Sequence, residues 1–294
     1  MTSAKLRWYL KIPLKFILAR IPLSHQTWYR LGIFKHGKMQ DFSYAQGVFT
    51  AHLARAGLLE KEKNIDKVVM ELGPGESLFS ALLARAYGFK RALLVDVGAF
   101  ALPGLNVYQS FSQWLANQGL PCPSISNCTS VDSMLAILDS QYLTDGLKSL
   151  RNLPDDSVDF LFSQAVLEHV RKDDLVDTIR ECWRILKPGG IITHEVDFKD
   201  HLEESLNNLR FSDLLWEADW MASSGFYTNR IRFGEMLEIF KIQGFEIAVL
   251  HKEEWSTVPI PQKYMQPRFR TIPDSDLKVS SAIIRLYKKN VRST

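Results

Sequence analysis

The chain has 294 residues, of which 46% are hydrophobic and 11% aromatic, so it can bury the core of one large domain with additions. Its formal net charge is only +3, but residues 1–40 hold eight Lys or Arg and no acid, which leaves −5 for the remainder. This distribution argues against a broadly basic surface for nucleic acid. The three cysteines, Cys122, Cys128 and Cys182, form neither a disulfide framework nor a zinc spacing.

Neither a membrane span nor a secretion signal is expected. No stretch approaches the roughly 18 consecutive apolar residues of a membrane-spanning helix. The start of the chain lacks an apolar run followed by a cleavage site. A reducing cytoplasm is therefore the expected compartment.

The N-terminal stretch interleaves apolar and basic side chains between residues 4 and 23. Pro13 and Pro22 punctuate it, so one or two short amphipathic helices are expected. Two roles fit such an arm. It can pack on the rest of the protein and cover a binding site, or it can attach to an anionic membrane at the inner membrane face, which basic charge with Trp8 and Phe16 favours.

A β-loop-α-β unit follows at residues 67–96. Two apolar runs, 67–72 and 91–96, predict buried parallel strands. Between them, Gly73-Pro74-Gly75 predicts a sharp turn, and a helix capped by Ser77 ends at Gly88. A glycine turn at the carboxyl end of a parallel strand is where a nucleotide-like ligand binds.

Two acids indicate which ligand fits this turn. Asp96, at the end of the second strand, is placed to accept the hydroxyls of an unphosphorylated ribose. Glu71 precedes the glycines, where it would repel a pyrophosphate but suit an ammonium group. Leu78 stands where a dinucleotide fingerprint has its third glycine. A ligand with ribose, adenine and an amino-acid tail, S-adenosylmethionine (SAM), therefore fits better than NAD.

These residues resemble the class I SAM-dependent methyltransferases of the small-molecule type. The resemblance covers residues 67–197 and has four parts in the family's order: ELGPG at 71–75, Val95-Asp96, LPDDSVDF with VLEHV at 153–170, and LKPGG at 186–190. The departure is Glu76-Ser77, where many members keep another glycine. The family implies a seven-stranded, mostly parallel Rossmann-like α/β sheet of order 3-2-1-4-5-7-6.

The resemblance also implies the cofactor-binding residues and the domain limits. The expected SAM contacts are Glu71, Gly73, Pro74, Gly75, Asp96, Val97, Asp145, Ser163 and Gln164. Asp145 follows the third strand, where class I members often place an acid against the adenine amine; a simple turn residue is the alternative. We assign residues 1–60 to a basic amphipathic helical arm and cap, and 61–294 to the methyltransferase domain, with a lid insertion at about 198–232.

Further elements follow from periodicity and breakers. Helices are expected at 48–59, 107–118, 131–138, 202–221 (with Leu214 and Leu215 facing inward) and 233–242, and one capped by Asp173 ends before Pro188. Strands are expected at 141–144, 158–163, 191–196, 245–250 and 279–287. The proline-rich segment 258–273 is too long for a tight hairpin.

The carboxyl end of the fifth strand carries the most chemical information outside the cofactor turn. His194 and Asp197 lie there, on the ligand side of the sheet, and are candidates for the general base that takes a hydroxyl proton. Structural hydrogen bonding is an alternative. A divalent metal held by His194, Asp197 and His201 is another, although the spacing is not diagnostic and we favour no metal.

The loop at 225–230 is the candidate substrate lid. Tyr227, Asn229 and Arg230 could bind a hydroxylated or anionic acceptor there, and a loop pinned by its own hydrogen bonds is the alternative. We expect methyl transfer to a hydroxyl of a small molecule, saccharide or lipid-linked glycan. The rival interpretations are C- or N-methylation of a quinone-like or other metabolite, an NAD-dependent oxidoreductase, and a non-catalytic SAM-binding scaffold. No nucleic-acid partner is expected, and the sequence does not indicate an oligomeric state.

Overall fold

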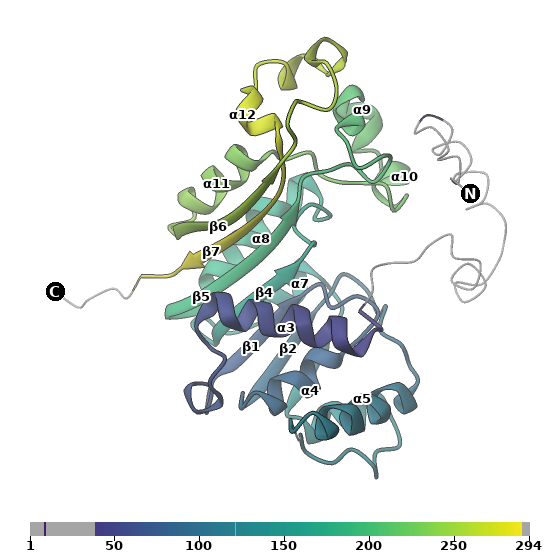
Figure 1. Ribbon diagram of the computed structural model, residues 1–294, viewed down its shortest axis with the longest axis vertical. Coiled ribbons are helices and arrows are strands. Elements are labelled where there is room, and N and C mark those ends of the chain that lie inside the picture. The colour runs from purple at the N-terminus through teal and green to yellow at the C-terminus, as the bar shows by residue number, and fades with distance from the viewer. Residues whose placement is uncertain (1–8, 10–38, 121, 290–294) are drawn as a thin grey trace.

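The computed structural model describes Tyr9 and residues 39–120 and 122–289. The predicted arm at 4–23 lies, apart from Tyr9, outside the described residues, so its expected helices are not tested. Figure 1 shows a sheet crossing the middle of the molecule, with α4 and α5 at one end and α9, α10 and α12 at the other.

The sheet has seven strands in the order β3-β2-β1-β4-β5-β7-β6, which confirms the expected topology. Strands β1 to β5 are parallel, and β7 joins β5 and β6 antiparallel. Their bounds are β1 Val68–Leu72, β2 Arg91–Val95, β3 Ser140–Leu143, β4 Val158–Gln164, β5 Leu186–Asp197, β6 Glu246–Glu254 and β7 Val279–Tyr287. The carboxyl ends of β1, β2, β4 and β5 therefore meet at one edge.

Helices cover both faces of the sheet, because the strands are apolar on both sides. One core holds side chains of α3 (Phe42–Ala56), α4 (Phe79–Ala86), α5 (Leu105–Asn117) and α6 (Val131–Ile137) against the first face. The other holds α8 (Lys172–Ile185) and α11 (Phe233–Ile242), with Leu150 of α7 (Leu147–Arg151). The cofactor turn and its neighbours are thus held between two rigid layers.

Several predicted helix limits are wrong, each for a local reason. Helix α3 begins at Phe42, because Asp41 accepts a hydrogen bond from Tyr44 N and caps it. Ser77 does not cap α4; its hydroxyl donates to Met39 O. The N-cap of α8 is Arg171, and Asp173 lies in the first turn, where a carboxylate favours the helix dipole.

The single helix predicted at 202–221 is also wrong. The segment instead forms the 3-10 turn η2 (Asn207–Arg210) and two short helices, α9 (Asp213–Trp216) and α10 (Asp219–Ala222). Leu214 is 91% exposed and Leu215 38%, so neither faces inward as predicted. The chain breaks because Leu206 and Leu209 are buried in one small core and Trp216 in another.

A cap forms from two segments distant in sequence, residues 198–232 after β5 and 255–278 between β6 and β7. The second contains η3 (Gln262–Tyr264), η4 (Pro267–Phe269) and α12 (Asp274–Leu277). Gln266 joins the two: its N–H donates to Leu209 O at 2.8 Å and its side-chain amide to Arg210 O at 2.8 Å. A shared apolar core of Leu206, Leu209, Met265 and Phe269 makes them one unit.

Within the described residues, no helix has the length and apolar character needed to cross a membrane.

Candidate active site

The glycine turn after β1 has the backbone that its sequence predicts. Gly73 and Gly75 have φ angles of +75° and +63°, which side chains with a Cβ rarely adopt. Gly73 N–H donates to Val95 O at 2.8 Å, so the turn is held to the end of β2. A Cβ on Gly73 would lie 2.5 Å from Val166 Cγ2. The turn that follows β4 therefore packs directly on the glycine turn.

Asp96 follows β2 and organises this turn. Its Oδ2 accepts from Gly75 N–H at 2.9 Å, and its Oδ1 accepts from Val97 N–H at 2.7 Å. Burial raises its pKa, and these two backbone donors partly offset the effect. Each carboxylate oxygen keeps a further lone pair for a ligand hydroxyl.

Glu71 is a buried carboxylate with unused hydrogen-bonding capacity. It is 3% exposed, and its Oε2 has no hydrogen-bonding partner within the described part of the chain. Burial raises its pKa to about 7; a hydrogen bond from Ser80 on α4 opposes the shift, and Asp96 adds to it. An unpartnered carboxylate in such surroundings fits a ligand cation.

These features fit SAM. Glu71 would accept hydrogen bonds from its ammonium group, and Asp96 would accept them from its ribose hydroxyls. Its amino-acid tail would lie beside Gly73 and Gly75. Val97 and Asp145 are both exposed. They lie on neighbouring loops, since Gly146 N–H donates to Asp96 O at 2.8 Å and a Cβ on Gly146 would touch Val97, so both would be available to the adenine as expected. When bound, SAM supplies an electrophilic methyl group on a sulfonium.

Two of the expected cofactor contacts are engaged elsewhere. Ser163 is fully buried, and its hydroxyl lies 2.7 Å from His194 Nδ1. Gln164 Oε1 lies 3.2 Å from Nε2 of His52, a buried residue of α3. Alternation along β4 directs these two side chains to opposite faces of the sheet, where Ser163 is buried and Gln164 half-buried. These contacts favour structural roles for both side chains, and their expected contact with the cofactor stays a prediction.

His194 is likewise a core residue in this geometry. Its side chain has no exposed surface, and its ring stacks on Phe240 of α11 with centroids 5.7 Å apart. Burial lowers its pKa to about 3. A histidine so placed has no route to an acceptor and little affinity for a proton. The structural interpretation of His194 fits these contacts, and the base interpretation does not.

Three ionisable side chains do lie together near the open edge of the sheet: His169 from the turn after β4, Asp197 from the end of β5, and His201 just after it. Asp197 interacts electrostatically with His169, which opposes the rise in the pKa of Asp197 that burial causes. The ring of His169 lies edge-on to that of His201, with centroids 4.8 Å apart. Of these, only Asp197 was an expected catalytic residue. The VLEHV motif was the signal that could have identified His169.

Glu168 is the most perturbed acid at this edge. It is 3% exposed, and neither carboxylate oxygen makes a hydrogen bond of normal length and angle within the described residues. Burial raises its pKa well above the usual range; nearby Asp197 and Glu195 add to the shift, and backbone amides partly offset it. A strongly perturbed pKa makes Glu168 a candidate functional carboxylate.

The loop at 225–230 is pinned by its own bonds. Asn229 donates to Leu167 O at 2.7 Å and Val170 O at 3.0 Å. The Tyr227 hydroxyl donates to Glu217 at 2.7 Å, and Arg230, without exposed side-chain surface, pairs with Asp213 and Glu217 at 2.5 and 2.8 Å. These side chains hold the cap to the turn after β4. The geometry favours that role over direct binding of an acceptor.

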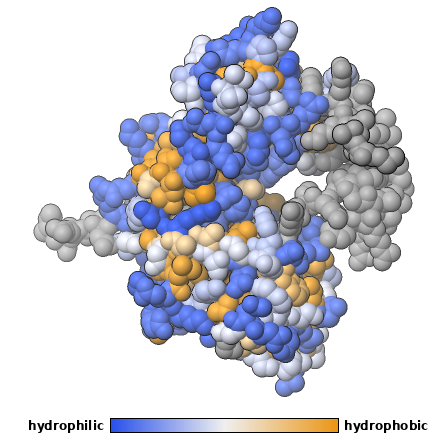
Figure 2. Space-filling model, viewed as in Figure 1, coloured by the Kyte–Doolittle hydropathy of each residue, from blue (hydrophilic) through white to orange (hydrophobic). Residues whose placement is uncertain are grey.

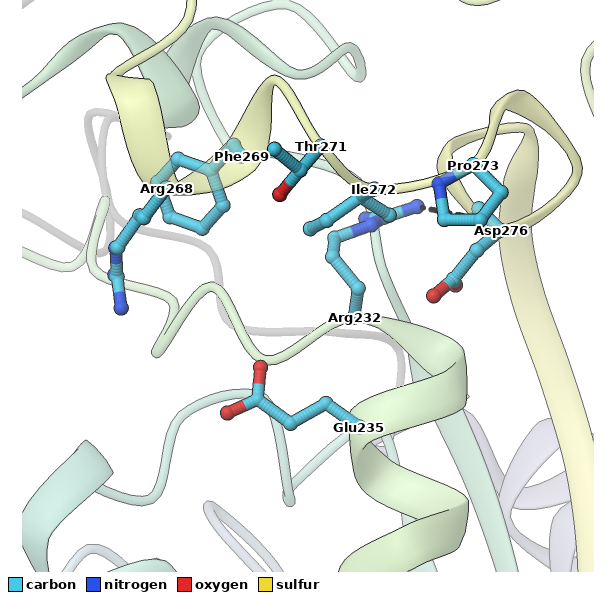
Figure 3. A pocket seen from close by; sticks show the side chains of 8 residues that line it. All are labelled: Arg232, Glu235, Arg268, Phe269, Thr271, Ile272, Pro273 and Asp276. Atoms are coloured by element: carbon cyan, nitrogen blue, oxygen red, sulfur yellow. Dashed lines mark hydrogen bonds between the residues drawn. The ribbon is translucent and has the colours of Figure 1, made fainter.

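A separate cavity of about 380 Å³ lies in the cap, between the start of α11 and the 268–276 segment (Figure 3). Arg232 and Glu235 line it from α11, and Arg268 and Asp276 from the other side. The Arg232 guanidinium donates to the carbonyl oxygens of Phe198, Asp276, Leu277 and Val279. Arg232 therefore ties the residue that follows β5 to the segment that leads into β7.

A search of residues 39–120 and 122–289 for three or more His, Cys, Asp or Glu arranged to hold a metal ion finds no such group.

Comparisons with known proteins find one family model and several similar solved structures. A model of the methyltransferase domain matches residues 108–193. Similar solved structures include a SAM-dependent methyltransferase from Methanosarcina mazei, at 16% identity and a TM-score of 0.49, covering 80% of this chain and 97% of that one. An S-adenosylmethionine-dependent methyltransferase from Mesorhizobium loti has 18% identity and a TM-score of 0.43, covering 79% and 94%.

A third similar structure is phosphoethanolamine N-methyltransferase 2 from Haemonchus contortus in complex with S-adenosyl-L-methionine, at 16% identity and a TM-score of 0.45, covering 82% of this chain and 52% of that one. A search of curated proteins finds no match. Likenesses this distant say nothing of the acceptor that this chain methylates.

The strand order, with a glycine turn after β1 and an acid after β2, defines a Rossmann-like methyltransferase sheet. With the match of the methyltransferase-domain model at residues 108–193, this makes the fold similar to that of class I SAM-dependent methyltransferases, and the general activity that the matched segment indicates is SAM-dependent methyl transfer.

Proposed function

We propose that this methyltransferase transfers the methyl group to a hydroxyl of a small molecule, saccharide or lipid-linked glycan. The supporting observation is that His169 lies near enough to Asp197 to interact with it electrostatically, in the turn after β4 whose Val166 packs on the cofactor turn. A hydroxyl is a poor nucleophile until a base accepts its proton, and a positioned base contributes about 10²–10⁴-fold.

The hydrogen bonds of His169 define which ring nitrogen takes the proton. Its Nδ1 lies 3.0 Å from the backbone oxygen of Tyr227. A carbonyl oxygen only accepts, so Nδ1 carries the hydrogen and Nε2 of the neutral ring is the basic atom. The carboxylate of Asp197 stabilises the imidazolium that forms when the acceptor's proton arrives. Asp197 is itself held by Lys199, whose N–H donates to Oδ1 at 2.8 Å.

The acceptor is to be identified first. Cells with and without the gene are grown on isotopically labelled methionine, and glycans, lipids and small metabolites are compared by mass spectrometry. The proposal expects labelled methyl on an oxygen that disappears with the gene. A labelled methyl on carbon or nitrogen would overturn it.

The base assignment is then tested with the purified enzyme. His169→Gln and Asp197→Asn should lower turnover about 10²–10⁴-fold while the affinity for S-adenosylhomocysteine changes little. Near-normal turnover in both variants would place the base elsewhere. A chelator should leave turnover unchanged; inactivation that Mg²⁺ or Mn²⁺ reverses would make these residues metal ligands.

Methyl transfer to an amine is the second candidate, and Glu168 favours it. A buried carboxylate whose oxygens make no hydrogen bond of normal geometry within the described residues is suited to an acceptor ammonium, which would restore its charged form. Under this alternative, Glu168→Gln raises the KM for the acceptor strongly, whereas under the hydroxyl proposal it acts mainly on kcat. A methylated nitrogen in the labelling experiment would support it.

A further inference from the structure

Asn229, in the cap, bonds to the backbone of the turn that carries Glu168 and His169. Its side-chain amide donates to Leu167 O at 2.7 Å and to Val170 O at 3.0 Å, and its backbone N–H donates to Glu168 O at 2.7 Å. Asn229 is 1% exposed, so these donors are withdrawn from water. One residue of the cap therefore holds the chain on both sides of His169.

The turn depends on such bonds, because residues 165–171 lie between β4 and α8 and belong to neither. Within it, His169 N–H donates to Val166 O at 2.8 Å, and Val166 packs on Gly73 of the cofactor turn. The turn is thus held at one end by the cofactor turn and at the other by Asn229. His169 lies between these two points of attachment.

The side chain of His169 bonds to the same loop of the cap. Its Nδ1 lies 3.0 Å from Tyr227 O, two residues before Asn229. A shift of the loop by about 1 Å would break this bond, since N···O distances beyond about 3.5 Å no longer make a hydrogen bond. Asn229 therefore fixes the separation on which the side-chain bond of His169 depends.

The loop is anchored in the cap on either side of Asn229. Before it, Thr228 O accepts from Trp216 Nε1 at 2.8 Å, and Thr228 Oγ1 accepts from Asn208 at 2.9 Å. After it, Arg230 has a φ of +63°, which a residue with a side chain rarely adopts. A backbone that stays in this region despite its cost points to a functional constraint.

The cap itself stands apart from the sheet on this face of the molecule. Figure 2 shows the molecule indented between the part that holds α9 and α10 and the part that holds α5. The cap has its own small apolar cores, separate from the two cores that cover the sheet. Its position over the turn after β4 therefore depends on contacts between the two, such as those of Asn229.

We propose that Asn229 is a positioning residue for His169. By holding residues 167–170 against the 227–229 loop, it keeps Nδ1–H on Tyr227 O and leaves Nε2 as the basic atom. A neutral imidazole without this partner populates both tautomers, and the tautomer with hydrogen on Nε2 cannot accept a proton there. The catalytic part of this role rests on the proposed function, in which His169 takes the proton of the acceptor.

The tautomer of His169 in the full-length protein tests the proposal without any acceptor. Nitrogen-15 NMR of histidine-labelled protein, at a pH where the ring is neutral, distinguishes Nδ1–H from Nε2–H. The signal of His169 is the one that is missing from His169→Gln. The wild type should be mainly Nδ1–H. In Asn229→Ala the ratio of Nδ1–H to Nε2–H should fall about three- to tenfold, the factor that one net hydrogen bond represents.

Thr228→Val is the matched control. It removes a buried side-chain hydrogen bond of the neighbouring residue, the one from Asn208, and none to the turn after β4. The tautomer ratio should stay unchanged in this variant even where the free energy of unfolding falls. Asn229→Ser keeps one shorter donor and should show a smaller fall in the ratio than Asn229→Ala, so it serves if the alanine variant does not fold.

A wild-type ring with its hydrogen on Nε2 would overturn the proposal. So would a ratio that the Asn229 variants and Thr228→Val change equally, because Asn229 would then act only through stability.

Turnover separates this proposal from the proposed function. In Asn229→Ala, kcat should fall about 10–10²-fold, because a displacement of about 1 Å costs that much, while the affinity for S-adenosylhomocysteine changes little. An unchanged kcat would overturn the catalytic role. If the labelled methyl is found on carbon or nitrogen while the tautomer ratio still depends on Asn229, the hydroxyl function is wrong and the positioning of His169 by Asn229 holds.

Discussion

At the scale of single residues, Glu71 makes the apo protein sensitive to pH. Its pKa of about 7 in the fold lies above the usual 4.5, so the folded state binds more protons than the unfolded state between these values. Stability is therefore lost as the pH rises from about 4.5 to about 7. The free energy of unfolding should fall by about 3 kcal/mol over this pH range.

Glu71→Gln should remove this dependence. The free energy of unfolding of the variant, minus that of the wild type, should grow by about 3 kcal/mol between pH 4.5 and 7 and then level off. Urea unfolding at several pH values measures the difference. Glu62→Gln, which replaces an exposed carboxylate, is the control. A difference that stays flat with pH would mean that Glu71 is not the group responsible.

The same carboxylate should couple cofactor binding to proton release. A ligand ammonium beside Glu71 favours its ionised form, so S-adenosylhomocysteine should displace a proton near pH 6. Calorimetry in two buffers of different ionisation enthalpy should show different binding enthalpies for the wild type and a smaller difference for Glu71→Gln. Equal buffer dependence in both proteins would separate Glu71 from the ligand.

Residues near the sheet edge also show which positions in the site a local sequence pattern can predict and which it cannot. Glu71, Gly73, Gly75 and Asp96 were predicted from their order along the chain, because a β-loop-α unit fixes their relation locally. His194 was chosen for its position at a strand end. Its burial depends on Phe240, 46 residues away on α11, which no local pattern specifies.

At the scale of elements, the contact between the turns after β1 and β4 predicts unequal costs for two glycine substitutions. Both Gly73→Ala and Gly75→Ala incur the left-handed backbone cost of about 1–2 kcal/mol. Only the Cβ on Gly73 meets Val166, at 2.5 Å, whereas nothing lies within 4 Å of one on Gly75. Gly73→Ala should therefore lower the free energy of unfolding by about 1–3 kcal/mol more.

A double-mutant cycle checks the source of that extra cost. Val166→Ala removes both methyl groups that the new Cβ would meet, so most of the difference between the two glycine variants should disappear in its presence. Chemical unfolding of the four proteins gives the coupling energy. Equal losses for both glycine variants, or additivity with Val166→Ala, would refute the contact.

The cap depends on Arg230, a buried cation between its two segments. Arg230 pairs with Asp213 and Glu217, and its guanidinium lies 5.7 Å from the ring centroid of Trp216 and 5.6 Å from that of Phe269. Arg230→Met should destabilise the protein by about 3–5 kcal/mol, because Glu217 loses its cation while Asp213 keeps only Arg268. Arg151→Met, which breaks an exposed pair with Asp177, should cost less than about 1 kcal/mol.

Hydrogen exchange locates the Arg230 effect. Protection should fall first in residues 205–230 and 262–270, which form the cap, and not in β1 or β4. Uniform loss of protection across the sheet would show that the cap is not a separate unit.

At the scale of the whole molecule, the strand order was predictable. The parallel strands, the glycine turn and the four motifs follow one another along this chain in the same order as in the family that it resembles. The cap was not predictable. Residues 202–221 have helical spacing of apolar side chains, but their partners lie at 260–277, so the two segments fold on each other and break the helix. Contacts between such distant segments override local propensity.

The central claim is that the edge formed by Gly73, Gly75, Glu71 and Asp96 binds SAM, and calorimetric titration of the purified protein with S-adenosylhomocysteine tests it most directly. We expect a dissociation constant on the order of micromolar or tighter. Asp96→Ala should lose about 1.5–3 kcal/mol for each charged hydrogen bond removed. NAD should give no comparable binding. NAD that binds as tightly as S-adenosylhomocysteine, or an affinity unchanged in Asp96→Ala, would contradict the account.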